Sequence, residues 1–178
     1  MAIGEARPGY ELWRPNRSKA SCLTTRLVII ILLLVSVALM LLVAFGGWPV
    51  LNGGPRYGFQ LILFSAVYLL IAYLIFKWSR GALSLTVALA VLLLIFALVG
   101  AGSWFARNKS GFEEGALPSE LLGTFVLILA AVQVALAVAC VIGVRQEWHV
   151  EAERPIGSGD ETPTASPAGP DAATATSA

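Results

Sequence analysis

The chain is poor in charge. Only 13% of its 178 residues are Asp, Glu, Lys or Arg, and the formal net charge is +1. A soluble domain carries about 25% charged residues, so the charged side chains of this chain are too few to cover a surface that faces water. A net charge this small excludes a basic nucleic-acid-binding module, and a hydrophobic content of 57% excludes a disordered chain. These absences leave a membrane protein as the expected class.

Reactive and metal-binding side chains are also scarce. The chain has 2 cysteines, too few for a disulfide scaffold, and 1 histidine. It has no catalytic or phosphate-binding motif. We therefore expect neither an enzyme nor a cofactor site. One cluster, Glu147, His149, Glu151 and Glu153, would share a face only in an extended chain. Because we expect a helix there, a solvated helix end is favoured over a metal site.

Four apolar segments without any charged residue occupy the middle of the chain: 27–45, 59–76, 82–101 and 121–144. A helix of about 20 apolar residues crosses the hydrocarbon core, where an open sheet edge would leave its backbone unsatisfied. We predict an all-α membrane protein in which four transmembrane helices over 27–144 form an antiparallel bundle. A signal sequence cleaved near Gly46 is the disfavoured alternative, because the first segment exceeds the roughly 7–15 residues of the apolar region of a signal peptide.

The flanks of these segments predict the orientation. Nine of the 12 Lys and Arg residues precede the first segment, join the second to the third, or follow the fourth. Cytoplasmic loops are enriched in these residues, so both termini are expected in the cytoplasm. The arginine-rich composition favours a bacterial plasma (inner) membrane. One tryptophan follows each segment, as expected of residues at the membrane surface: Trp48, Trp78, Trp104 and Trp148.

The parts outside the apolar segments are small. Residues 1–26 are predicted to be a basic cytoplasmic tail, and residues 145–154 a helical extension of the fourth segment. Residues 155–178 are rich in Pro, Ala, Ser, Thr and Gly, so we expect a disordered C-terminal tail. The short 77–81 connection predicts that the second and third helices are neighbours. Ser119 is the expected N-cap of the fourth helix.

The apolar segments contain no ionisable Asp, Glu, Lys, Arg or His side chain. Carriers and pumps commonly use such residues, so a proton relay is not expected. The most polar side chain within the segments is Gln133, near the middle of the fourth. An amide in hydrocarbon needs a partner on another helix or subunit. We expect Gln133 to join helices, and consider a substrate or lipid contact the less favoured role.

The fourth segment also carries small residues at every fourth position: Ala131, Ala135, Ala139 and Gly143. Small residues at this spacing let another helix backbone approach closely. We interpret this ridge as a packing face for the bundle or for a partner. That partner would be a second copy or another membrane protein.

These features favour a non-enzymatic subunit, scaffold or assembly factor of a membrane complex. Its expected partners are the lipid bilayer and a membrane protein, with no nucleic acid. The alternative is a small transporter or channel for a neutral or apolar substrate, as a monomer or a homo-oligomer. A transporter would need a water-accessible cavity around Gln133, Tyr68 and Tyr73. A scaffold would need only a dry bundle with an exposed alanine ridge.

Overall fold

The computed structural model describes residues 9–13, 19–47, 55–79, 81–105, 116–146 and 152–156. The chain divides into two compact units. One unit is Arg14–Val150, and the other combines Met1–Trp13 with Glu151–Ala178.

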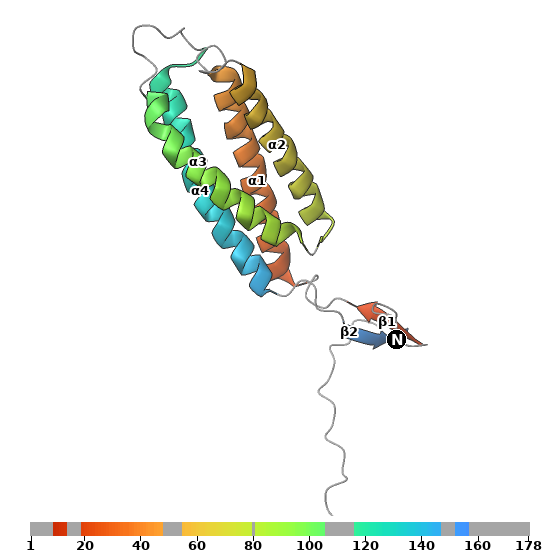
Figure 1. Ribbon diagram of the computed structural model, residues 1–178. Helices are drawn as coiled ribbons and strands as arrows, with labels where there is room; N and C mark the ends of the chain where they lie inside the picture. The colour runs from red at the N-terminus through yellow and green to blue at the C-terminus, as the bar shows by residue number, and fades with distance from the viewer. Residues whose placement is uncertain are drawn as a thin grey trace, which may run out of the picture. The chain divides into compact units, whose positions relative to one another are not determined.

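The first unit contains four helices that pack lengthwise beside one another (Figure 1). They are α1 (Ala20–Gly46), α2 (Pro55–Phe76), α3 (Ala82–Phe105) and α4 (Ser119–Arg145). All four are long and apolar enough to cross a membrane. The four predicted helical segments are therefore confirmed.

Their boundaries differ from prediction at both ends of the unit. α1 begins at Ala20, so the last part of the predicted tail 1–26 is helical. α4 begins with Pro118 as its N-cap, so the assignment of Ser119 to that position is wrong by one residue. The Pro118 carbonyl accepts from the N–H groups of Leu121 and Leu122, at 3.1 Å each, and no side-chain cap is made.

The predicted helical extension over 145–154 is wrong where the structure describes it, and residues 147–151 lie outside the described residues. α4 ends at Arg145, and Ala152–Pro155 forms the strand β2. Pairing with β1 gives the backbone N–H and C=O groups of Ala152–Pro155 hydrogen-bond partners outside a helix. Pro155, predicted to open the disordered tail, is the last residue of this strand. The rest of that tail, from residue 157, lies outside the described residues.

The second unit is a two-stranded antiparallel ribbon of β1 (Tyr10–Trp13) and β2. Tyr10 lies opposite Pro155 and Trp13 opposite Ala152. The Ile156 N–H donates to the Gly9 carbonyl at 3.0 Å, which continues the pairing by one bond. The segment before α1 thus pairs with the segment after α4.

In the helical unit, α1 packs against both α2 and α4, and α3 packs against α4. By contrast, α2 and α3 touch over only a short stretch, although a tight connection joins them. The connection constrains only the ends of the helices. Further along, the rings of Phe64 and Phe96 meet edge to face at 6.5 Å between centroids. The expectation that α2 and α3 are packing neighbours is therefore met only in part.

The ends of the helices meet in a defined pattern. Near the start of α1, Arg26 donates to the carbonyl of Phe76 at the end of α2. At the same end, the Gln146 amide after α4 donates to Thr25 Oγ1 at 2.9 Å. At the opposite end, the Leu117 N–H donates to the Gly46 carbonyl at 3.1 Å. The start of α1 therefore lies beside the ends of α2 and α4.

Candidate functional site

A hydrogen-bonded set of three buried side chains, the polar triad, links three of the helices. It consists of Ser36 on α1, Tyr68 on α2 and Gln133 on α4, each with 0% of its surface exposed. The Tyr68 hydroxyl donates to Gln133 Oε1 at 2.9 Å, and Gln133 Nε2 donates to Ser36 Oγ at 2.9 Å. The Ser36 hydroxyl donates in turn to the Leu32 carbonyl at 2.8 Å. The chain of donors therefore ends on the backbone of α1.

The surroundings of the triad are apolar. Tyr68 belongs to the larger hydrophobic cluster, together with Leu33, Ile71, Leu136 and Cys140. Hydrogen bonds are stronger in such a medium, and an unpaired polar group there is costly. Each side chain of the triad has a hydrogen-bond partner within it. The direct chemical consequence of these bonds is the linkage of α1, α2 and α4.

The sequence signal for these partners is their depth. Ser36, Tyr68 and Gln133 each lie within about one residue of the middle of a predicted apolar segment. Helices that cross the same layer place their midpoints at one level, so mid-segment polar groups can meet. From the sequence, Gln133 was expected to join helices and Tyr68 was named only for a transporter cavity, because nothing in the sequence says which helices are neighbours.

Tyr73 lies away from the polar triad. Its side chain is 56% exposed on the outside of α2, whereas Tyr68 and Gln133 are fully buried. The three side chains expected around a water-accessible cavity are thus not gathered in one place.

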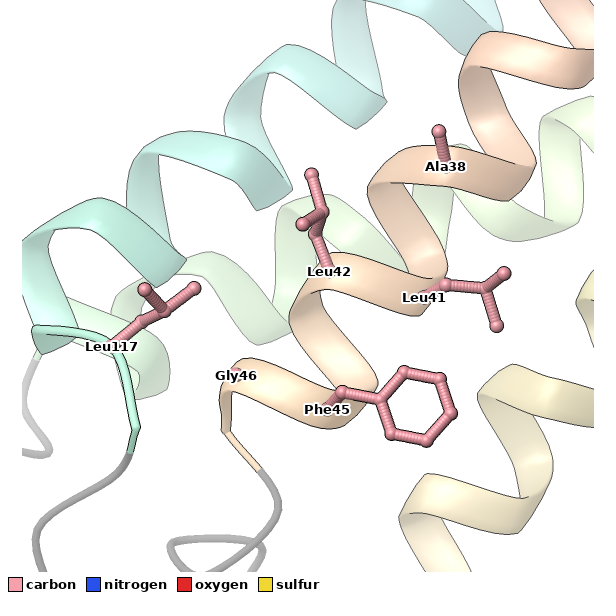
Figure 2. A pocket seen from close by; sticks show the side chains of 6 residues that line it. All are labelled: Ala38, Leu41, Leu42, Phe45, Gly46 and Leu117. Atoms are coloured by element: carbon pink, nitrogen blue, oxygen red, sulfur yellow. The ribbon is translucent and has the colours of Figure 1, made fainter.

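A surface hollow of about 480 Å³ lies near the end of α1. Figure 2 shows that Ala38, Leu41, Leu42 and Phe45 line it from α1, with Leu117 facing them from the segment before α4. Gly46 completes the lining, and the lining surface is almost entirely apolar. Such a surface accommodates hydrocarbon and offers no polar group to orient a solute.

The small-residue ridge does not form one face of α4. Ala131 and Ala135 are exposed, whereas Ala139 and Gly143 are buried. A step of four residues advances about 40° beyond one full turn, so the ridge winds around the helix axis. Its first half faces outward and its second half faces the other helices. Gly123, earlier in α4, is buried against the Phe105 ring of α3.

A cluster of Arg26, Phe76 and Trp78, the arginine clamp, lies where α1 begins and α2 ends. The guanidinium carbon of Arg26 is 4.8 Å from the Phe76 ring centroid and 4.5 Å from that of Trp78. Trp78 has a φ of 59°, which few residues other than glycine adopt. The Trp78 N–H donates to the Ile75 carbonyl, and the Ser79 N–H donates to the Leu74 carbonyl, both at 3.0 Å. This pair of bonds is the Schellman motif at a helix C-terminus.

The arginine clamp was not predicted, because Arg26 was interpreted only as an orientation signal and Trp78 only as a membrane-surface residue. Trp104 also differs from expectation. It lies within the last turn of α3 rather than beyond it, and its side chain is only 9% exposed. Its ring packs over Gly47, where a Cβ would come within 2.7 Å. Trp48 and Trp148 lie outside the described residues.

Charge is distributed unevenly between the ends of the helices. The cations whose side chains are described in the helical unit are Lys19, Arg26, Lys77 and Arg145. All lie at the end where α1 begins and where α2 and α4 finish. The acidic residue described in this unit, Glu120, is at the opposite end, in the first turn of α4.

No group of three His, Cys, Asp or Glu residues that could hold a metal occurs among the described residues. Of the cluster considered above, Glu147, His149 and Glu151 lie outside them. Cys22 and Cys140 are free and buried. In the comparisons with known proteins, no family model, curated protein or solved structure matches the chain.

Proposed function

We propose that this chain is a multi-pass protein of the bacterial plasma membrane that acts as a non-enzymatic subunit, scaffold or assembly factor of a membrane complex. In this proposal its four helices form an antiparallel transmembrane bundle, and both termini lie in the cytoplasm. The observation that carries the functional part is the polar triad, which is buried and hydrogen bonded within itself.

The arrangement of the helix ends supports the antiparallel bundle. The start of α1 is hydrogen bonded to the end of α2 and to the residue after α4, and the end of α1 to the segment before α4. Pairing of β1 with β2 supports termini on one side, because strands that precede α1 and follow α4 can pair only on the same side of a bilayer. The cations collected at the start of α1 support a cytoplasmic location for that side.

The triad favours a scaffold over a carrier. A carrier must expose polar groups to its substrate at mid-membrane depth, but Gln133 and Tyr68 are bonded to each other and enclosed. Tyr73, the remaining polar side chain of a possible pathway, faces outward on α2. The amide therefore serves best as a fixed link that holds three helices in register.

The outward half of the ridge supplies a surface for a partner. Ala131 and Ala135 are exposed, with Val134 (49% exposed) and Val138 (55% exposed) beside them. Small side chains let a second backbone approach closely enough for dispersion contacts, which drive helix association in lipid. We assign this face of α4 to a membrane-protein partner.

The test is purification of the tagged full chain from its native membranes in a mild detergent, with quantitative mass spectrometry of the material that copurifies. A membrane protein in fixed stoichiometry with the chain supports the subunit or scaffold proposal. A chain that purifies alone or as a homo-oligomer contradicts it. Flux of neutral solutes into liposomes would then test the transporter alternative.

A matched pair of variants tests the partner face. In the double variant Ala131→Phe and Ala135→Phe, two bulky rings should block close approach and remove the partner, while the thermal midpoint of the chain stays unchanged. Ala66→Phe places a similar ring on an exposed alanine of α2 and should retain the partner. Equal loss of the partner in both variants would contradict the assignment of the partner-binding face to α4.

A further inference from the structure

The arginine clamp fixes a cation at the end of the helices expected to face the cytoplasm. The Arg26 side chain lies against two aromatic rings and donates one hydrogen bond, to the Phe76 carbonyl. Arg26 Nε is buried and has no hydrogen-bond partner. A guanidinium has five N–H donors, and only one on Nη2 is used by a described residue, so the remaining Nη N–H groups are available to a ligand while the buried Nε–H is not.

The chain also does not neutralise this charge within the described helical unit. Lys77, next to Phe76, lies over the Tyr73 ring with Nζ 5.8 Å from the centroid, so it too is held on an aromatic face. No carboxylate is described at this end of the unit, since Glu120 lies at the other. Two aromatic-supported cations therefore lie at the end of α2 without an acidic partner in the part of the helical unit that the structure describes.

We propose that Arg26, supported by Lys77, binds the phosphate of an anionic phospholipid headgroup in the cytoplasmic leaflet. The planar guanidinium matches a phosphate through two parallel hydrogen bonds, and the leaflet itself supplies anionic lipid at high local concentration. The aromatic rings hold the guanidinium in place before the lipid arrives, which lowers the entropy lost on binding. A lipid also brings acyl chains that lie against the exposed apolar side chains of α1 and α2, such as Leu27 and Phe76.

The backbone conformation of Trp78 supports a specific binding site around Arg26. A left-handed φ costs a non-glycine residue about 1 kcal/mol, and a glycine would end α2 without that cost. The tryptophan ring is what lies over the Arg26 guanidinium. The strained residue at the helix end is thus the one that orients the cation.

The first experiment uses the full chain purified in a non-ionic detergent and three probes: phosphatidylglycerol, phosphatidylcholine with the same acyl chains, and inorganic phosphate. Native mass spectrometry counts bound lipids, and the thermal midpoint is followed against probe concentration. We expect phosphatidylglycerol to bind about tenfold more tightly than phosphatidylcholine, and inorganic phosphate to leave the midpoint unchanged. Equal binding of the two lipids would overturn the proposal, and stabilisation by inorganic phosphate would identify a free-anion site instead.

Variants then localise the site. Arg26→Gln should abolish the preference for phosphatidylglycerol, and Arg26→Lys should weaken it while keeping the charge. Arg145→Gln removes one exposed cation from the same end and should leave the preference intact. If Arg145→Gln weakens binding as much as Arg26→Gln does, the attraction is diffuse and the site is refuted. If Arg26→Gln does not fold, the lysine variant and the wild-type lipid comparison still decide the question.

The site depends on the proposed membrane orientation but not on a protein partner. Failure to find a copurifying protein would leave the lipid preference unaffected. Failure of the lipid preference would likewise leave the partner face on α4 untouched.

Discussion

Gln133 is the residue on which the packing of three helices depends. Its amide oxygen accepts from α2 and its amide nitrogen donates to α1, so one side chain on α4 satisfies both neighbours. The residue spacing within α4 could not reveal this, because periodicity gives the face of a helix and not the identity of the helix opposite. What the sequence could predict was that an amide in an apolar segment needs a partner.

Removing the Tyr68 hydroxyl tests the polar triad. In Tyr68→Phe, Gln133 Oε1 loses its donor while the ring volume is kept, so we expect a destabilisation of about 1 kcal/mol. Tyr73→Phe removes the exposed hydroxyl of the same helix and should leave stability unchanged. Unfolding in mixed detergent micelles, followed by circular dichroism, measures both. Equal stability of the two variants would mean that the triad contributes nothing.

Replacing the amide itself is the stronger test. Gln133→Leu replaces the amide with an apolar side chain of similar size and leaves the buried Tyr68 hydroxyl without its acceptor. We therefore expect the free energy of unfolding to fall by about 1–3 kcal/mol. The same unfolding assay, combined with the purification described above, measures folding and partner binding together. If both remained intact in this variant, Gln133 would have no structural role.

At the scale of the helices, the most extensive packing is between α3 and α4. A Cβ built at Gly123 would lie 2.7 Å from ring atoms of Phe105, closer than real Cβ atoms come. Overpacking against the Phe105 ring, which is 38% exposed and can shift, outweighs the gain in helix propensity, so we expect Gly123→Ala to destabilise the chain by about 1 kcal/mol. Gly102→Ala, in the open part of α3, meets no atom within 4 Å and should be stabilising by about 0.5–1 kcal/mol. Thermal unfolding of the two variants should shift in opposite directions.

The helices were predictable from hydropathy and their ends were not. All four apolar segments are helical, because uninterrupted apolar residues of that length have few other ways to satisfy the backbone in lipid. The helical turns from Ala20 to Arg26 were missed because polar side chains there resemble a tail. The end of α4 was misjudged because strand pairing with a segment more than a hundred residues away competes with local helix propensity.

The small-residue ridge shows a related limit of sequence reasoning. Ala131 and Gly143 share a four-residue spacing, yet one is exposed and the other buried. A repeat of four drifts around an axis of 3.6 residues per turn, and the drift becomes large over three steps. The pattern indicates where close packing is possible, while the neighbouring helices decide which members use it.

For the whole molecule, the proposed orientation can be read by labelling. Gly81→Cys, between α2 and α3, and Ala116→Cys, before α4, both introduce an exposed thiol. The native Cys22 and Cys140 are buried and give a low background. With a membrane-impermeant maleimide, we expect Ala116→Cys to react in intact cells, and Gly81→Cys only after the membrane is opened. Reaction of Gly81→Cys in intact cells would reverse the orientation.

The pairing of β1 with β2 has a consequence for how the chain is made. The ribosome releases β1 before the first helix and β2 only after the last. The two strands can therefore pair only after all four helices have been synthesised. Until then the backbone of β1 has no partner from β2. The ribbon therefore forms only in a chain synthesised past its fourth helix, and a chain that stalls or is truncated before Ala152 leaves β1 without β2.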